Sequence, residues 1–235
     1  MIELKSILQF PQDIIALDEV GRSPLSGPVV IGALKLTVND PEFLKSLIRL
    51  LKRKGIKDSK LLTTERRLEL LSALKIPPCS FRQKGEFSLK GITLNFVTWE
   101  MDHQVIDTEN ILAASLRGMK EAALFLAGED KTQTTLLIDG PFKLRWEKES
   151  PFKEVTIVKG DVKSPLIGLA AIIAKEKRDQ LMREMDLLYP QYGFKTNVGY
   201  PTKEHRQAIS LHGPCPIHRK SFNKVKEFIP APKIG

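Results

Sequence analysis

The chain has 235 residues, enough to bury a substantial core, and its composition predicts one domain with an appended subregion. Its 37 lysines and arginines outnumber 28 acidic residues, and the net charge of +9 suits a polyanionic partner such as nucleic acid. Two distant cysteines without a CxxC pair argue against a disulfide framework or a thiolate zinc site. No apolar run matches a membrane span and the N-terminus lacks a leader pattern, so a cytoplasmic protein without membrane contact is expected.

Two segments near the N-terminus have the composition of strands. The apolar run 13–17 (DIIAL) ends in Asp18 and Glu19, and the β-branched run 28–37 (PVVIGALKLT) follows the turn-rich sequence GRSPLSG. The two acids are therefore predicted at a strand end beside a tight glycine turn, where carboxylates are held rigidly and stay accessible.

Helices are predicted where apolar residues recur three and four positions apart, at 41–53, 64–74, 110–127 and 165–188. Thr63 or Thr64 is a plausible N-cap for the second helix. Ser164 followed by Pro165 is a typical start for the last one. Beyond residue 190 the chain is rich in glycine, proline and histidine.

Three further strands are predicted in the remaining sequence. One lies at about 80–85, and the stretch from there through Trp99 gives no clear element. The run 135–138 ends at Asp139-Gly140, and the run 154–158 ends in Lys159-Gly160-Asp161. Acids thus follow three separate strands.

If these three strands are neighbours in one sheet, Asp18, Glu19, Asp139 and Asp161 converge at its edge. Such a cluster of like charges is tolerable only when cations neutralise it, and hard oxygen ligands suit Mg²⁺ or Mn²⁺. Two such ions ~4 Å apart can promote an in-line phosphoryl displacement. The alternative is that Asp139-Gly140 is only a turn and Asp161 only flanks a helix. The coincidence at three strand ends favours the metal site.

The segment ALDEVGRSPLSGPVVIGAL resembles the N-terminal signature of the ribonuclease HII family, whose common form is DEAGRGPLAGPVV. Further motifs of that family follow in the family's order, so the resemblance covers residues 13–226. They are Asp58-Ser59-Lys60, Ile106-Asp107 with Asn110-Ile111, Leu137-Ile138-Asp139-Gly140, VKGDVKSPLIGLAAIIAKEKRD, Gly199-Tyr200, His205 and HRKSF from His218.

The resemblance implies an α/β, ribonuclease H-like fold with a mixed five-stranded sheet flanked by helices, in which the first three strands pair antiparallel. Residues 1–163 would form the catalytic core and 164–235 a mainly helical, substrate-binding subregion of the same structural domain. It also implies an endonuclease that hydrolyses the RNA strand of RNA/DNA hybrids. A monomer is our default expectation for the oligomeric state. The family cuts on the 5′ side of ribonucleotides embedded in duplex DNA, leaving 3′-hydroxyl and 5′-phosphate ends.

The resemblance also assigns roles to individual residues. Asp18, Glu19, Asp139 and Asp161 would be the catalytic acids that hold two Mg²⁺ or Mn²⁺ ions. Gly21, Arg22 and Ser23 occupy the GRG positions, whose main chain recognises the ribose 2′-hydroxyl. Tyr200 matches a tyrosine that packs at the RNA/DNA junction. Lys60, Lys175 and Arg178 lie in matched segments and are interpreted as phosphate contacts or active-site support. For Lys52-Arg53-Lys54 and Arg66-Arg67, a solvent-exposed helix face is an equally good interpretation. His205 and His218 are expected to stabilise the C-terminal part.

The sequence departs from the family pattern at three places. Ser23 replaces the second glycine of GRG, and its β-carbon narrows the space beside the ribose and disfavours a positive φ. Ala171 stands where the family has a serine, so a hydroxyl for substrate phosphate is missing. The segment 143–154 is longer than expected, and we interpret it as a surface hairpin.

Two alternatives stay open on sequence grounds. Ribonuclease HIII is a sister family with the same acids, but the 12 residues before Asp13 leave no space for its extra N-terminal domain. The other alternative is a nucleic-acid-binding module that has lost catalysis, suggested by Ser23 and Ala171. Retention of all four acids favours an enzyme, because a binding protein gains nothing from negative charge where phosphate must lie.

Overall fold

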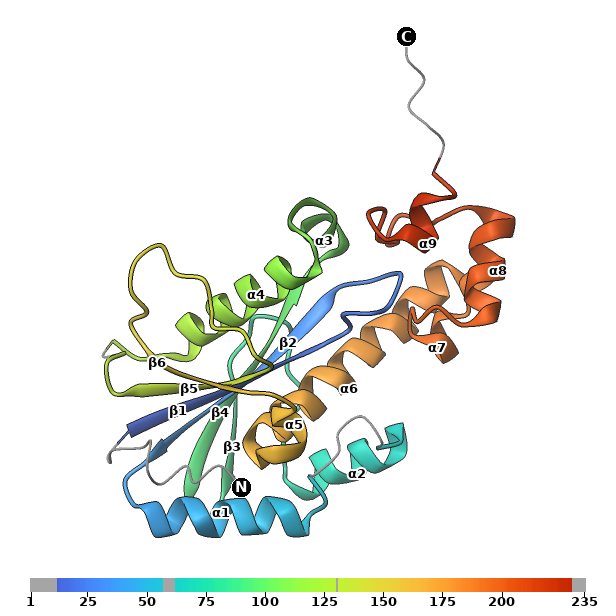
Figure 1. Cartoon of the computed structure of the whole chain (residues 1–235). Coiled ribbons are helices and arrows are strands. Elements are labelled where there is room, and N and C mark those ends of the chain that lie inside the picture. Colours follow the sequence, from blue (N-terminus) through green and yellow to red (C-terminus); the bar gives the residue numbers. More distant parts are fainter. Residues whose placement is uncertain (1–11, 57–61, 130, 230–235) are drawn as a thin grey trace.

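A six-stranded mixed sheet forms the centre of the computed structural model, which describes residues 12–56, 62–129 and 131–229 (Figure 1). The strand order is β3-β4-β2-β1-β5-β6. β1 pairs antiparallel with β2 and parallel with β5, and β5 pairs parallel with β6. The strand bounds are β1 Gln12–Val20, β2 Val29–Val38, β3 Gly85–Leu89, β4 Ile92–Met101, β5 Thr134–Asp139 and β6 Lys153–Ile157.

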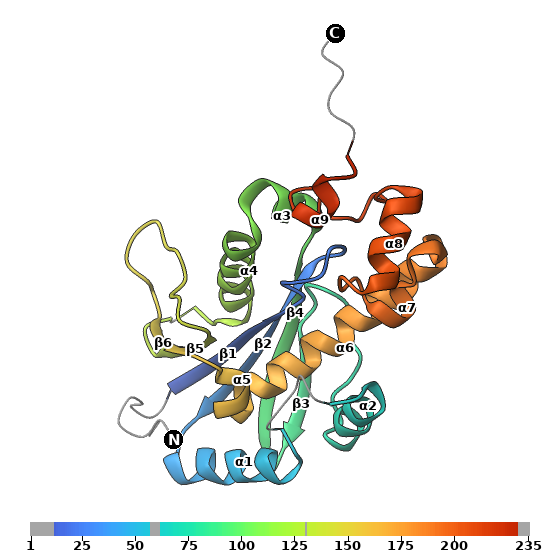
Figure 2. The ribbon, with the colours of Figure 1, turned by 45° about the vertical axis from the view of Figure 1, so that its right-hand side comes forward.

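Helices cover both faces of the sheet, with α4 and α6 on opposite sides (Figure 2). Side chains of β1 alternate between two cores: Ile14 and Ala16 face α6, and Ile15 and Leu17 face α4. Burial on both sides explains why the segment is apolar throughout. The helices are α1 (Pro41–Arg53), α2 (Thr64–Ala73), α3 (His103–Glu109), α4 (Ile111–Leu126), α5 (Gly160–Lys163), α6 (Pro165–Leu188), the 3₁₀ helix η2 (Pro190–Tyr192), α7 (Phe194–Asn197), α8 (Lys203–His212) and α9 (Asn223–Lys226).

The long helix α6 lies unusually close to the sheet. A β-carbon at Gly32 of β2 would collide with the backbone carbonyl of Ala170, so glycine is needed for this approach. Pro165 occupies the first turn of α6, as predicted, although the Ser164 side chain makes no capping hydrogen bond. The close packing places Ala171 and Lys175 of α6 beside the C-terminal end of β1.

The antiparallel half of the sheet differs from the sequence prediction. Instead of one strand at 80–85, the chain forms a hairpin of β3 and β4, which makes the sheet six-stranded rather than five-stranded. Lys90 and Gly91 form the turn, both with positive φ (51° and 80°). A two-residue hairpin turn of type I′ needs positive φ at both positions, a conformation that lysine seldom adopts, so the sequence gives no clear signal for this turn. The helix α3 was also not predicted.

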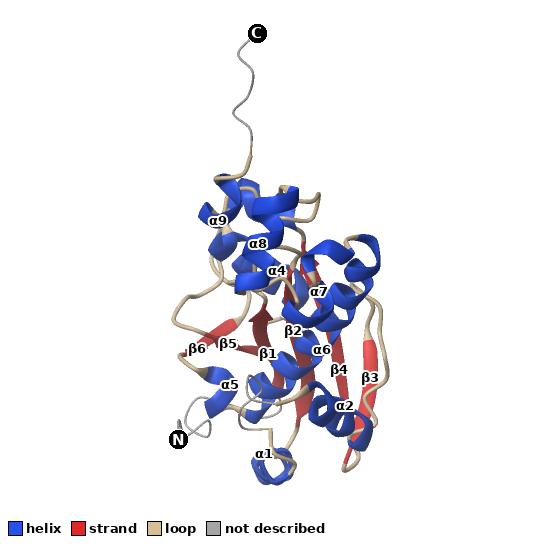
Figure 3. Ribbon diagram, turned by 90° about the vertical axis from the view of Figure 1, so that its right-hand side faces the viewer, coloured by secondary structure: helices blue, strands red, loops and turns tan. Residues whose placement is uncertain are grey.

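The C-terminal part forms a third hydrophobic core beyond the end of β1 (Figures 1 and 3). Leu25, from the loop after β1, packs into this core together with Met182 of α6 and Phe194. The loop is also joined to this part by main-chain hydrogen bonds from Leu25 N to Gly199 O (2.7 Å) and from Arg219 N to Leu25 O (2.8 Å). Among the described helices, none has the length and apolar character needed to cross a lipid bilayer.

The long connection between β5 and β6 contains no strands, so the predicted surface hairpin is wrong. It folds around the Glu154 carboxylate, which accepts hydrogen bonds from Leu144 N (3.1 Å), Ser150 Oγ (2.9 Å) and Trp146 Nε1. Leu144 and Phe152 are buried beneath it. Hydrogen bonds to one carboxylate, rather than hydrogen bonds between strands, therefore hold this loop together.

Candidate active site

Three carboxylates from two neighbouring strands meet at one edge of the sheet. Asp18 and Glu19 lie near the end of β1, and Asp139 is the last residue of β5. The parallel register pairs Leu17 with Ile138, so the next residues along each strand, Asp18 and Asp139, are brought side by side. Asp18, Glu19 and Asp139 each contribute an oxygen atom to a set in which all atoms lie within 4.8 Å of one another.

Asp161 reaches the same region from a different kind of element. It lies in the short helix α5 rather than at the end of β6, and it is 2% exposed. It stands outside the set of three, but its charge helps raise the pKa of Asp18. The adjacent Gly160 N donates a hydrogen bond of 2.6 Å to Asp139 Oδ1, which joins the start of α5 to the end of β5.

Asp18 is buried instead of accessible as the sequence suggested, with only 2% of its surface exposed. Its pKa is raised well above the ordinary value, first by burial and then by the charges of Glu19, Asp139 and Asp161. The Glu19 backbone N–H, which donates to Asp18 Oδ1 at 2.7 Å, opposes this shift. The ionised cluster is therefore unfavourable by itself and needs a cation. An all-carboxylate donor set fits Mg²⁺ or Mn²⁺.

A cavity of about 560 Å³ opens over these carboxylates. It brings together most of the residues singled out from the sequence, acidic and basic alike. Its lining consists of Asp18, Glu19, Val20, Gly21, Arg22, Ser23, Asp139, Ala171, Lys175 and Tyr200.

The loop after β1 forms one wall of the cavity. Gly21 has φ +95°, and a β-carbon there would collide with the Arg178 guanidinium, so both conformation and space require glycine. Ser23 is exposed and is not in the positive-φ region, so its β-carbon narrows the cavity without straining the backbone. The exposed Arg22 pairs with Glu19 (Nη1 to Oε1, 3.2 Å).

Arg178 does not lie where a phosphate contact would require. The residue is 0% exposed, and its guanidinium donates hydrogen bonds to the carbonyls of Pro28 (3.0 Å), Val198 (2.8 Å) and Ser26 (3.1 Å). Its pKa is lowered to about 10, mainly by burial. Arg178 therefore supports the loop from behind, next to Gly21. Of the two roles predicted from the sequence, its burial contradicts a phosphate contact and favours active-site support.

Arg219 is a residue that sequence reasoning missed. It is 0% exposed and donates three hydrogen bonds to the loop after β1. The signal was its position within the HRKSF run, which was noted only as a family motif. Its neighbour His218 is also buried, and Nε2 of His218 lies 3.1 Å from Nε2 of His205, which places both histidines inside the C-terminal core as expected.

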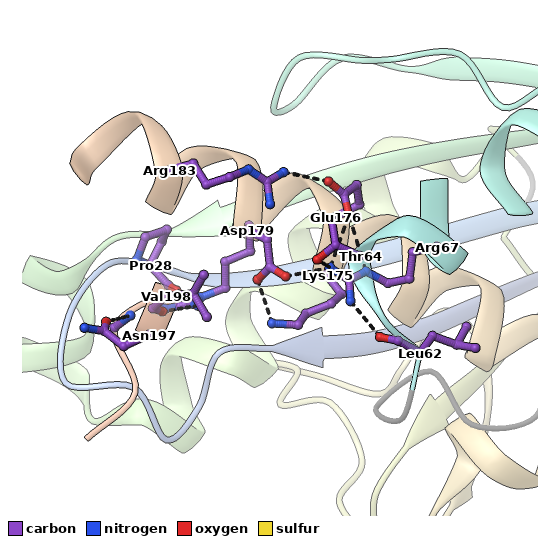
Figure 4. Close-up of polar contacts among 12 residues, drawn as sticks. Pro28, Leu62, Thr64, Arg67, Lys175, Glu176, Asp179, Arg183, Asn197 and Val198 are labelled. Atoms are coloured by element: carbon purple, nitrogen blue, oxygen red, sulfur yellow. Dashed lines mark hydrogen bonds and ion pairs between the residues drawn. The ribbon is translucent and has the colours of Figure 1, made fainter. Parts of the chain in front are cut away.

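Lys175 is held at the cavity by an ion-pair network on α6 (Figure 4). Its Nζ donates to Asp179 Oδ1 (2.6 Å) and lies 5.7 Å from the Tyr200 ring centroid. Asp179 Oδ2 accepts from Arg67 Nη2 (2.7 Å). Arg67 also bonds to Glu176. The network orients the ammonium group beside Tyr200.

Arg67 is 3% exposed, so its interpretation as part of a solvated helix face is wrong, while Arg66 is exposed as suggested. Helical spacing alone cannot distinguish a basic residue that faces solvent from one that meets acids of a distant helix. The family-matched segment Asp58-Ser59-Lys60, including the predicted substrate-binding Lys60, lies outside the described residues.

The fold is similar to that of known ribonucleases H2 and HIII. The ribonuclease H2 of Pyrococcus horikoshii superimposes with a TM-score of 0.62 at 21% identity, covering 92% of this chain and 96% of that one. A structure of Bst-RNase HIII in complex with Mn²⁺ gives a TM-score of 0.58 at 16% identity, covering 92% of this chain and 69% of that one. At these identities the similarity establishes the ribonuclease H-like fold.

Sequence comparison establishes the family. The chain is 38% identical to a ribonuclease HII of Desulfotalea psychrophila over 226 residues, covering 96% of this chain and 87% of the relative. It is also 38% identical to a ribonuclease HII of Pelodictyon phaeoclathratiforme over 209 residues, covering 89% and 88%. The Ribonuclease HII family profile matches residues 15–225. The chain with this acidic cavity therefore belongs to the ribonuclease HII family, whose members are hydrolases that act on the RNA of RNA/DNA hybrids.

Proposed function

We propose that this endonuclease also cuts DNA duplexes that contain a single ribonucleotide, on the 5′ side of that nucleotide, and leaves 3′-hydroxyl and 5′-phosphate ends. The observation that carries the proposal is the shared cavity, in which the cluster of Asp18, Glu19 and Asp139 lies beside the main chain of residues 21–23. One part of the cavity suits hydrolysis of a phosphodiester, and the other suits recognition of one sugar.

The carboxylates would hold two divalent cations, with Asp18, Glu19 and Asp139 as ligands and Asp161 beside them. When bound, such ions lower the pKa of a water nucleophile and stabilise the leaving oxygen. The Mn²⁺ complex of Bst-RNase HIII supports this choice of ion by analogy of fold. The protein's own contribution is rigidity: Gly160 N fixes Asp139, and Glu19 N fixes Asp18.

The basic and aromatic groups would position the substrate. Lys175 faces the cavity from α6 and suits a phosphate oxygen of the cleaved strand. Tyr200 lies next to Lys175 and suits packing against the nucleotide pair at an RNA/DNA junction. The part from residue 164 onward would serve as the substrate-binding subregion, and the chain would act as a monomer on hybrids and on ribonucleotide-containing DNA.

The rival proposal is a binding module without catalysis, motivated by Ser23 and the loss of a hydroxyl at Ala171. The raised pKa of Asp18 argues against it, because a module that only binds nucleic acid has no use for a buried acidic cluster. Ala171 does line the cavity, so the missing hydroxyl affects substrate contact rather than the carboxylates.

The test is a cleavage assay on three duplexes of equal sequence: an RNA/DNA hybrid, DNA with one ribonucleotide, and DNA alone. With Mg²⁺ or Mn²⁺ we expect cleavage of the first two, a 3′-hydroxyl on the upstream product, and no cleavage of the third. With EDTA all cleavage should stop. Metal-dependent binding without any cut strand would favour the binding module, and cleavage of the hybrid alone would contradict the proposal for single ribonucleotides.

A further inference from the structure

The backbone carbonyls of the loop after β1 accept hydrogen bonds from a buried arginine, Arg219, which lies in the C-terminal part of the chain. Arg219 Nη2 donates to Gly21 O (2.6 Å), Nη1 donates to Arg22 O (2.9 Å), and Nε donates to Gly27 O (2.9 Å). Arg219 is 0% exposed. One planar guanidinium thus draws three carbonyls, from both ends of the loop, toward the protein interior.

This arrangement fixes the direction of two N–H groups. In a trans peptide the C=O and the N–H of the next residue point in opposite directions within one plane. Since the carbonyls of Gly21 and Arg22 point inward to Arg219, the N–H groups of Arg22 and Ser23 point outward. Both residues line the cavity over the carboxylates. Among the residues that the structure describes, neither N–H donates to an acceptor.

We propose that Arg219 is a positioning residue for sugar selectivity, because it directs the N–H groups of Arg22 and Ser23 toward the 2′-oxygen of the ribonucleotide to be cleaved. The inference rests on the proposed function and deepens it. Phosphate oxygens share the ability to accept from such donors. The two duplexes of the test below distinguish these acceptors, because both duplexes carry phosphates and only one carries a 2′-hydroxyl.

The free-energy cost of burying the Arg219 guanidinium suggests that the residue serves to position the loop backbone rather than to stabilise the fold. The three groups that accept its hydrogen bonds are neutral carbonyls, and burial together with the nearby Arg178 lowers the pKa of Arg219 to about 9. A buried cation of this kind is a poor source of stability compared with apolar packing. A rigid fork that reaches three separate carbonyls is something that arginine provides and lysine does not.

The test uses Arg219→Lys, with Arg178→Lys as the matched control. Arg178 is equally buried and also donates to three carbonyls, but these belong to Ser26, Pro28 and Val198 and not to the Gly21 or Arg22 peptides. Binding is measured in Ca²⁺, without turnover, to a DNA duplex with one ribonucleotide and to the same duplex without it. Circular dichroism and melting temperature confirm that each variant is folded.

We expect Arg219→Lys to reduce the preference for the ribonucleotide duplex by on the order of tenfold, the worth of about one hydrogen bond. Affinity for the all-DNA duplex should change by less than about twofold, and Arg178→Lys should keep the preference within about twofold. An equal loss of affinity for both duplexes would mean that the N–H groups bind phosphate, or that Arg219 contributes to stability alone. Equal losses of preference in the two variants would reveal general loosening of the loop. Either result overturns the proposal, as does an unchanged preference.

A second measurement uses the unaltered protein and decides the matter even if Arg219→Lys fails to fold. With ¹⁵N-serine labelling, the Ser23 amide resonance should move downfield when the ribonucleotide duplex is added, and it should stay in place with the all-DNA duplex. An amide that responds equally to both duplexes contradicts the inference. The proposed function fails separately, if the wild type binds the ribonucleotide duplex but never cuts it with Mg²⁺.

Discussion

The acidic edge of the sheet and the loop after β1, which we call the arginine-held loop, differ in how buried charge is balanced. At the edge, Asp18 is buried next to other carboxylates, and its pKa is raised first by this burial and then by the neighbouring negative charges. Behind the loop, Arg178 of α6 and Arg219 of the C-terminal part are buried as deeply, but each donates three hydrogen bonds to backbone carbonyls. The first region therefore needs, in the function we propose, an added cation to balance its charge, whereas in the second region the hydrogen-bond partners come from the chain itself.

The largest expected effect comes from removing charge at the acidic edge. Asp18→Asn should reduce cleavage by on the order of 1000-fold or more, since one ligand of the metal cluster is lost. The same variant should melt at a higher temperature than wild type in EDTA, because a buried charge among like charges is gone. Single-turnover cleavage and thermal unfolding measure the two effects.

The matched control is Asp13→Asn at the other end of β1, where Asp13 pairs with Lys35 (2.7 Å). It should keep its cleavage rate and lose rather than gain stability. Wild-type turnover by Asp18→Asn would remove the metal assignment. A lower melting temperature of Asp18→Asn in EDTA would show that the edge is balanced without a cation.

Duplex binding should depend steeply on salt. If about four phosphates are contacted, affinity should fall on the order of 100-fold between 50 and 200 mM salt, because condensed counterions are released. Lys175→Gln should lower the log–log slope by about one, as expected for a single phosphate contact. The exposed Lys54, at the end of α1, provides the control, and Lys54→Gln should leave the slope unchanged. If the affinity of the wild type did not change with salt, the proposed phosphate contacts by basic side chains at the cavity would be wrong.

The acidic edge and the C-terminal core behind the loop should also respond oppositely to acid. Burial, and then the nearby His205, lower the pKa of His218 to about 4. A depressed histidine pKa gives stability that is present above the ordinary value of 6.5 and is lost as pH falls from 6.5 toward 4. The raised pKa of Asp18 has the opposite sign, so the acidic edge gains stability as protons bind.

The variant His218→Gln separates these contributions. In EDTA its melting temperature should fall less than that of wild type between pH 6.5 and pH 4, by roughly 5 °C at the acid end. Thermal scans across this range make the measurement. Parallel curves for the two proteins would mean that His218 titrates normally.

The smallest expected effect concerns Ser23. Its backbone needs no positive φ, so Ser23→Gly gains only space at the cavity wall, and cleavage at a single ribonucleotide should rise a few-fold, at most on the order of tenfold. The cleavage rate on a long RNA/DNA hybrid should rise less, because the enzyme can bind such a hybrid at any of several neighbouring ribonucleotides. Ser23→Ala, which keeps the β-carbon, is the control. If both variants lose activity on both substrates, the hydroxyl contacts substrate and the steric account is wrong.

The sequence predicted the acidic edge well because strand ends leave local signals. Apolar runs that stop at Asp18 and Asp139 identify both the strands and the acids, and parallel pairing of β1 with β5 then places those acids together. Asp161 was predicted at the end of a strand, but it lies in the short helix α5. The sequence Lys159-Gly160-Asp161 is compatible with either element, so the sequence alone does not distinguish them.

The arginine-held loop was less predictable because its partners are distant in sequence. Arg219 meets carbonyls almost 200 positions earlier, and Arg178 meets the same loop from α6. Backbone carbonyls carry no sequence signature, so a basic residue that serves them resembles one that binds phosphate. The β3–β4 hairpin was missed for a similar local reason, since Lys90 adopts a turn conformation that favours glycine or asparagine.

The central claim, that the acidic edge is completed by divalent cations, is tested most directly by counting the ions that bind. Titration of the wild type with Mn²⁺, followed by the electron paramagnetic resonance of free Mn²⁺, should show two bound ions per chain in the presence of an uncleavable duplex. Asp18→Asn should bind fewer ions or bind them much more weakly, and Asp13→Asn should match the wild type. Equal Mn²⁺ binding by wild type and Asp18→Asn would contradict the account.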